Sequence, residues 1–124
     1  MTNKYWNSFY RKFDVNNPSN FAKFCVKKIN KNDLNLDVGC GNGRDTNYFV
    51  KKGYKFIGTD LSTKVVELNN KSYGNFFFRS NFCSKSSKFN FLKNKKIINI
   101  YARFFIHTIN LKDQIQFFKN IKKY

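Results

Sequence analysis

The sequence predicts an α/β fold in which a parallel sheet of about four strands is flanked by helices. Apolar runs of strand length alternate along the chain with segments of helical periodicity, which is typical of consecutive strand–helix–strand units. A glycine-rich turn at 39–43 directly follows the first apolar run. The chain has 124 residues, of which 41% are hydrophobic and 19% aromatic, and this is enough for one globular domain.

A helical segment is expected before the first strand. Asn17-Pro18 is typical of a helix start, and the apolar residues that follow it predict a helix over 18–31. We therefore expect a helical cap segment at 1–31 and the sheet domain at 32–124. An earlier amphipathic helix is indicated by aromatic residues that share one helical face, namely Tyr5, Trp6, Phe9, Tyr10 and Phe13.

Four apolar runs of strand length follow this segment. They predict strands at 34–39, 54–60, 76–78 and 97–106. Residues 81–95 are mostly polar and predict a loop between the third and fourth strands.

Three further helices are expected between and after these strands. Asp45 is expected to cap a helix that ends at Lys52, and Ser62 or Thr63 opens the next one. The last helix is expected over 111–123, where apolar residues recur at helical spacing. The order of elements therefore favours parallel strands joined by helical crossovers.

The glycine turn indicates a nucleotide-type ligand. Glycines permit a tight turn and close approach of the backbone, and the following helix presents free N–H groups. The spacing is G-x-G-x-G, which differs from the G-x-G-x-x-G of dinucleotide sites, and Arg44-Asp45 stand where a phosphate-binding loop has its lysine. Asp60 ends the second strand, where an acid can accept hydrogen bonds from both ribose hydroxyls.

Two motifs resemble those of the class I S-adenosylmethionine-dependent methyltransferases. They run from Leu36 to Gly43 (Leu-Asp-Val-Gly-Cys-Gly-Asn-Gly) and from Gly58 to Ser62 (Gly-Thr-Asp-Leu-Ser). The resemblance covers roughly residues 34–110, and it implies a Rossmann-like fold and S-adenosylmethionine as the cofactor. Tyr5-Trp6 and the run from Tyr101 to His107 are similar to a bacterial subgroup, which implies a saccharide or another small metabolite as the methyl acceptor.

The resemblance also implies roles for individual residues. The three glycines of the turn would line the methionine part of the cofactor, Asp37 would help to anchor that end, and Asp60 would hold the ribose. Asn81 stands where the family usually has an acid that contacts the adenine amine, and its amide oxygen can still accept from that amine. Ile98 stands where the family usually has a further acid. The implied cofactor site comprises Asp37, Gly39, Cys40, Gly41, Gly43, Asp60, Leu61, Asn81 and Phe82.

Three residues near the end of the fourth strand are candidates for the acceptor side of the site. Tyr101 and Arg103 alternate on the strand and therefore point the same way, toward the edge where open α/β sheets bind ligands. His107 is the single histidine of the chain and a candidate general base. Each of the three also has a structural alternative, and methyl transfer depends more on in-line placement and desolvation than on acid–base groups.

The sequence accounts for only part of the sheet that the family is known for, whose strand order is 3-2-1-4-5-7-6. The fourth strand would then be an apolar edge, which is a pairing and aggregation hazard. We therefore expect self-association, or dependence on a partner chain at this edge. The alternative function is a truncated, non-catalytic module that binds the cofactor or a partner.

Charge and cysteine content limit the partners, the metal content and the cellular compartment that we expect. Lysine and arginine total 24 against seven acids, a net charge of +17, yet the lysines are scattered along the chain. We expect no specific nucleic-acid partner, and RNA methyl transfer is kept as a second alternative. The three cysteines lack metal-ligand spacing, so no metal is expected and a reducing cytoplasm fits best. We expect neither a membrane span nor a signal peptide, because no apolar run is long enough.

Overall fold

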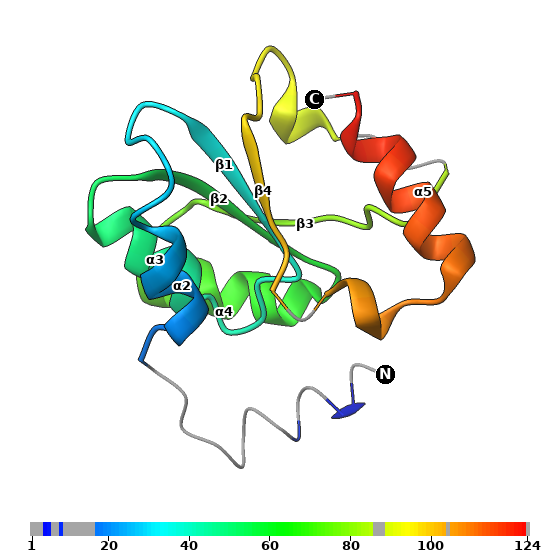
Figure 1. Ribbon diagram of the computed structural model, residues 1–124. Coiled ribbons are helices and arrows are strands. Elements are labelled where there is room, and N and C mark those ends of the chain that lie inside the picture. The colour runs from blue at the N-terminus through cyan, green and yellow to red at the C-terminus, as the bar shows by residue number, and fades with distance from the viewer. Residues whose placement is uncertain (1–3, 6–7, 9–16, 86–88, 104, 124) are drawn as a thin grey trace.

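The computed structural model describes residues 4–5, 8, 17–85, 89–103 and 105–123 (Figure 1). Most of the aromatic stripe expected over residues 5–13 lies outside these residues. Four parallel strands form one sheet in the order β3-β2-β1-β4. The strands are β1 (Leu34–Val38), β2 (Lys55–Asp60), β3 (Phe77–Arg79) and β4 (Asn99–Tyr101). The predicted α/β class with a parallel sheet is therefore confirmed.

The central strand β1 pairs with β2 on one side and with β4 on the other. Asp37 lies opposite Gly58 of β2 and opposite Tyr101 of β4. Because all pairs are parallel, the carboxyl ends of the strands meet at one edge of the sheet. The residues that follow each strand are therefore gathered there, which is where open α/β sheets form their ligand sites.

The helices cover both faces of the sheet. They are α2 (Asn20–Cys25), α3 (Arg44–Lys51), α4 (Thr63–Tyr73) and α5 (Leu111–Ile121). Short 3₁₀ turns lie at Asn90–Leu92 and Ile106–Thr108. In Figure 1, α5 lies on the opposite side of the sheet from α2 and α3. The sheet is therefore the middle of three layers.

Two apolar clusters hold these layers together. Side chains of a strand alternate between the two faces of a sheet, so Phe56 and Ile57 enter different clusters. On one face Phe56 stacks on Phe49 of α3, with ring centroids 4.2 Å apart, beside Ala22 of α2. The cluster on the other face contains Leu36, Val38, Ile57, Phe82, Phe89, Leu92, Ile97 and Phe117.

Several predicted boundaries are wrong, each for a local physical reason. The helix expected over 18–31 ends at Cys25, because the chain then forms turns in which Lys27 and Lys28 donate to carbonyls three residues earlier. The helix after the turn is capped by Gly43, in the left-handed region at φ 75°, and not by Asp45. Ser62 caps α4 as expected, since its hydroxyl accepts from the N–H of Val65.

The fourth strand is much shorter than the 97–106 run that we predicted. Only residues 99–101 form strand, pairing with 35–37 of β1. The chain then turns away and enters the 3₁₀ turn at Ile106–Thr108. Phe105 and Ile106 at the end of the run pack against the cluster that contains Phe117. Apolar character without alternation does not distinguish these two outcomes.

A buried carboxylate joins three elements on the α2 side of the sheet. Asp45 of α3 accepts hydrogen bonds from the backbone N–H of Ser19 (2.8 Å), the hydroxyl of Ser19 (2.7 Å) and the hydroxyl of Tyr101 (2.7 Å). All three residues are buried. The Ser19 hydroxyl also caps α2 by accepting from the N–H of Ala22. Asp45 therefore fixes α2 to α3 and to the end of β4.

Replacement of Tyr101 by phenylalanine tests this network. The variant loses a hydrogen bond to a buried charged group, so we expect the free energy of unfolding to fall by about 1.5–3 kcal/mol. Tyr54→Phe is the matched control, because the Tyr54 hydroxyl donates to the neutral carbonyl of Val26 and its loss should cost about 0.5–1.5 kcal/mol. Urea unfolding measures both. If Tyr101→Phe lowers the free energy of unfolding no more than Tyr54→Phe does, the result would contradict a hydrogen bond from Tyr101 to a charged Asp45.

Candidate functional site

The glycine turn connects β1 to α3 at the carboxyl edge of the sheet. Gly39, Gly41 and Gly43 have φ angles of 71°, 57° and 75°, all in the left-handed region. Residues with a Cβ rarely adopt this conformation, so the spacing of the glycines follows directly from the path of the backbone. The predicted position of the turn is confirmed.

Hydrogen bonds from neighbouring elements hold the turn in place. The N–H of Cys40 donates to the carbonyl of Thr59 (2.9 Å), and the side-chain amide of Asn69 on α4 donates to the carbonyl of Gly41 (2.7 Å). The N–H of Gly41 donates to Asp60 Oδ2 (3.0 Å). The turn is therefore fixed to β2 and α4 as well as to its own strand and helix.

Asp60 lies at the end of β2 with its carboxylate turned toward the glycine turn. Its second oxygen, Oδ1, accepts from the N–H of Ser62 (3.0 Å). A carboxylate has about four lone-pair positions, so two protein donors leave it able to accept from a ligand. The side chain is half-buried, and Leu61 beside it is 47% exposed. The structure therefore brings Asp60, Leu61 and the turn together as the sequence predicted.

Asp37 lies deeper than the other candidate residues. It is 3% exposed, and its Oδ2 accepts a hydrogen bond from the Thr46 hydroxyl (2.6 Å). Burial raises the pKa of Asp37 to about 8, and the charges of Asp45 and Asp60 act in the same direction. The Thr46 hydrogen bond and the charge of Arg103 lower the pKa less than burial raises it. Asp37 therefore supports the turn from below as a mainly neutral acid at pH 7.

This raised pKa predicts a pH dependence of stability. Between the usual value of 3.8 and the folded value of about 8, the native state holds a proton that the unfolded state has released. The free energy of unfolding should therefore fall as pH rises through this window, by up to ~1.4 kcal/mol per pH unit. Asp37→Asn should remove this fall, whereas Asp33→Asn on the preceding loop should keep it. Urea unfolding between pH 4 and pH 8.5 checks this, and equal slopes in wild type and Asp37→Asn would contradict it.

Asn81 and Phe82, the two residues expected beside the adenine, lie in different surroundings. The side-chain oxygen of Asn81 accepts from the N–H of Cys83 (3.0 Å), as in a turn. Phe82 is 2% exposed, and its ring stacks on Phe89 with centroids 4.4 Å apart. Phe82 therefore belongs to the core and does not present its ring to a ligand. Ile98 is 49% exposed, just before β4.

Cys40, which lies between the first two glycines of the turn, does not have an activated thiol. Burial raises the pKa of its thiol above the usual value, so the reactive thiolate is disfavoured. Cys25, Cys40 and Cys83 are all free thiols. No group of three His, Cys, Asp or Glu side chains that could hold a metal ion occurs within the described part of the chain.

The three acceptor-side candidates differ in their surroundings. Tyr101 is buried with its hydroxyl donated to Asp45, and burial raises the pKa of that hydroxyl further above its usual value. Arg103 is half-buried just beyond β4 and close enough to influence the Asp37 carboxyl. His107 is exposed in the second 3₁₀ turn. The geometry favours a structural role for the Tyr101 hydroxyl.

Sequence reasoning missed Phe105, which lies against the turn. A Cβ added at Gly39 would be only 2.9 Å from Cδ2 of Phe105, so the ring lies directly over this glycine. The ring also packs against Phe117 of α5, with centroids 5.2 Å apart. An apolar side chain thus covers one side of the first glycine of the turn, while Gly39 as a whole stays exposed. The sequence showed only an apolar run here, without a sign of its direction.

Three polar residues around the turn were also missed as partners of the site. Asp45 and Thr46 follow the turn directly, so the sequence shows that they lie near it. The hydrogen bonds of Asp45 with Ser19 and Tyr101, and of Thr46 with Asp37, depend on the tertiary fold. Asn69 is one of two adjacent amides on α4, and nothing in the sequence distinguishes it from Asn70. These residues support the turn and do not themselves form an open surface.

Comparison with known families identifies the domain. Residues 36–124 match the family model described as a methyltransferase domain. The chain belongs to this family. The match covers the glycine turn, Asp60, the last three residues of β1 and the other three strands of this methyltransferase domain, in agreement with the Rossmann-like fold expected from the two motifs. No curated protein matches the sequence.

Solved structures with the same fold are distant in sequence. A TehB-like SAM-dependent methyltransferase from Corynebacterium glutamicum has a TM-score of 0.75 at 16% identity, covering 97% of this chain and 66% of its own. A SAM-dependent methyltransferase from Anabaena variabilis has a TM-score of 0.69 at 20% identity, covering 96% and 54%. The glycopeptide N-methyltransferase MtfA, complexed with sinefungin, has a TM-score of 0.72 at 14% identity, covering 93% and 48%.

These likenesses establish the fold of this methyltransferase domain. The chain spans between about half and two thirds of the length of the three structures. Within the described residues, no helix is both long and apolar enough to cross a bilayer.

Proposed function

We propose that this methyltransferase domain binds S-adenosylmethionine and transfers its methyl group to a small acceptor, a saccharide or another small metabolite. One observation carries the proposal. The glycine turn, with its three left-handed glycines, packs against the Asp60 carboxylate at the carboxyl edge of the sheet, through the bond from Gly41 N–H to Asp60 Oδ2. The family match over 36–124 supports the same assignment.

The described residues fit this cofactor at the ribose and the methionine part. The Asp60 carboxylate keeps the capacity to accept from the two ribose hydroxyls. Leu61, which is 47% exposed, offers an apolar surface beside it. Gly39 is exposed and Gly41 is half-buried, so the amino-acid part of the cofactor can approach the backbone at these two glycines. Asp37 lies behind the turn, where its ionisation would be favoured by a cationic ligand.

Fit at the adenine part is weaker. Phe82 is buried in the core, so its ring cannot cover the base, and the Asn81 oxygen already accepts from Cys83. That oxygen retains a second lone pair for the adenine amine. Most of the binding free energy should therefore come from the ribose and the methionine part.

S-adenosylmethionine supplies an electrophilic methyl group on a sulfonium. The chain has to align an acceptor with that methyl and exclude water from it. Phe105 lies over Gly39 and provides an apolar cover at the methionine end of the turn. Arg103 and His107 follow β4 at the same edge of the sheet, and we retain them as candidates for contacting the acceptor.

Cofactor binding can be tested by calorimetry on the purified chain. Asp60→Ala removes the acceptor of the ribose hydroxyls, and since hydrogen bonds to a charged group are worth about 1.5–3 kcal/mol each, we expect at least tenfold weaker binding. Asp33→Ala is the control, because it removes an aspartate distant from the turn. NAD should bind more weakly than S-adenosylmethionine.

Thermal melts of each variant show whether the fold is intact. A folded wild-type chain that binds no S-adenosylmethionine would contradict the proposal. Binding without turnover on any acceptor would support the alternative function instead, a non-catalytic cofactor-binding module. That alternative is motivated by the observation that this chain spans only 66% and 48% of the length of two solved methyltransferase structures with the same fold.

We also propose that the outer edge of β4 is completed by another strand, from a second copy of the chain or from a partner. β4 is the last strand of the sheet order, and no described residue pairs with its outer edge. Ile98 at the start of this edge is 49% exposed. An unpaired edge with apolar side chains favours strand addition.

Light scattering tests the β4 edge. The wild-type chain should show a mass above the 14.8 kDa of one copy, because apolar edges associate. Ile98→Lys should lower this mass, since a lysine on an edge strand opposes pairing. Leu68→Lys on α4, where Leu68 is 54% exposed, is the matched control and should leave the mass unchanged. A wild-type monomer that catalyses methyl transfer would show that the edge needs no partner.

A further inference from the structure

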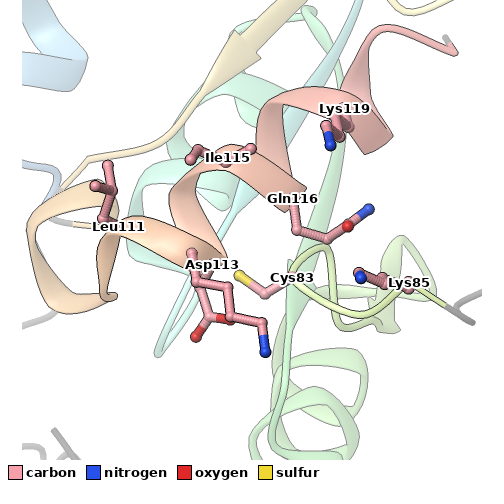
Figure 2. A pocket seen from close by; sticks show the side chains of 8 residues that line it. Cys83, Lys85, Leu111, Asp113, Ile115, Gln116 and Lys119 are labelled. Carbon is pink, nitrogen blue, oxygen red and sulfur yellow. The ribbon is translucent and has the colours of Figure 1, made fainter.

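A concave surface crosses the outer side of α5 (Figure 2). It encloses about 610 Å³ between the helix and the segment at 83–85 that lies beside it. We call this surface the α5 groove. Its lining residues are Cys83, Lys85, Leu111, Lys112, Asp113, Ile115, Gln116 and Lys119. We propose that the α5 groove docks an acidic amphipathic helix from another polypeptide.

The first argument is an apolar stripe on α5 that faces away from the core. Leu111 is 70% exposed and Ile115 and Phe118 are each 49% exposed, at positions i, i+4 and i+7. This spacing places the three side chains on one face of the helix, which is the pattern that a packed partner helix covers. The core side of α5 is already occupied, because Phe117 is 1% exposed within the main cluster.

The second argument is charge. Lys85, Lys112 and Lys119 are all exposed around the groove, and Asp113 is the single acid among its lining residues. Figure 2 shows Lys85 and Lys119 near one end of the groove. Lysines that border an apolar surface complement a partner whose apolar face is bordered by Asp and Glu. The proposed helix therefore has leucine-type residues on one face and acids beside them.

The third argument is that the groove is held in shape. The side-chain amide of Asn120 donates to the carbonyls of Phe82 (2.6 Å) and Ser84 (3.1 Å), which ties α5 to the segment beside it. Gln116 in turn donates to the side-chain oxygen of Asn120 (3.0 Å). A surface that is already formed loses little conformational freedom when a partner binds.

Other occupants fit the same observations less well. A second copy of this chain, with 24 basic residues against seven acids, would bring like charges to the groove. A bilayer surface suits a broad apolar face, whereas this stripe is one side chain wide and borders a hollow. Nucleic acid would use the lysines but leave the aliphatic Leu111 and Ile115 without a favourable partner.

The probe for the test is a fluorescent synthetic peptide of about 18 residues with leucine at i, i+4 and i+7 and glutamate beside them. Fluorescence polarisation with the full-length chain at physiological salt measures binding. Wild type should bind this peptide at least tenfold more tightly than a peptide of the same composition in scrambled order. The reason is that scrambling keeps the charge and removes the apolar face.

Variants of the groove distinguish docking from general charge attraction. Leu111→Ser with Ile115→Ser, and separately Lys112→Glu with Lys119→Glu, should each weaken binding at least tenfold. Lys64→Glu with Lys71→Glu on α4 is matched to the second pair, since these lysines are also exposed and seven residues apart. Leu68→Ser on α4 is matched to the apolar pair. Both control variants should bind within about twofold of wild type.

Three results would overturn the proposal. They are no binding of the peptide to wild type, equal weakening by the α4 controls, and equal binding of the scrambled peptide. The proposal is also overturned if phosphatidylserine vesicles or an RNA oligonucleotide bind with the α5 dependence described above while the peptide does not. S-adenosylmethionine calorimetry on each variant reports separately on the cofactor site, because the altered side chains lie outside the glycine turn and Asp60.

Discussion

The parallel pairing of β1 with both β2 and β4 is the constraint on which the rest of the structure depends. It places the ends of three strands side by side, so the glycine turn after β1 contacts Asp60 at the end of β2, and Arg103 follows β4 at the same edge of the sheet. The turn then takes hydrogen bonds from β2 and α4 that no neighbour in sequence could provide.

Two aspartates of this edge serve different purposes because their surroundings differ. Asp37 is enclosed beneath the turn, so desolvation dominates its pKa and the neutral acid is favoured. Asp60 lies at the rim, half-buried, and receives two backbone N–H groups. The first supports the turn, and the second is available to a ligand. Asp45 is a third case, whose carboxylate accepts three hydrogen bonds that join α2, α3 and β4.

Two surfaces of the domain expose groups that a partner could cover. The outer edge of β4 has no strand beside it in the described chain, and α5 exposes an apolar stripe flanked by lysines. They differ in chemistry, since the first offers backbone hydrogen bonds and the second offers apolar contacts with basic borders. The excess of lysine keeps copies of the chain apart at the α5 groove, so the two surfaces favour different kinds of partner.

The sequence by itself determined the α/β class, the position of the glycine turn and the pairing of that turn with Asp60. These follow from local chemistry, because left-handed turns select glycine and buried parallel strands select apolar runs. The tertiary structure alone decided that β4 stops at Tyr101, that Phe82 enters the core, that Phe105 covers Gly39, and that Asp45 binds Ser19 and Tyr101. Each of these features depends on which side chain, distant in sequence, packs against the residue. The hydrophobic pattern of the sequence indicates that a residue is buried, but it does not indicate which residues surround it.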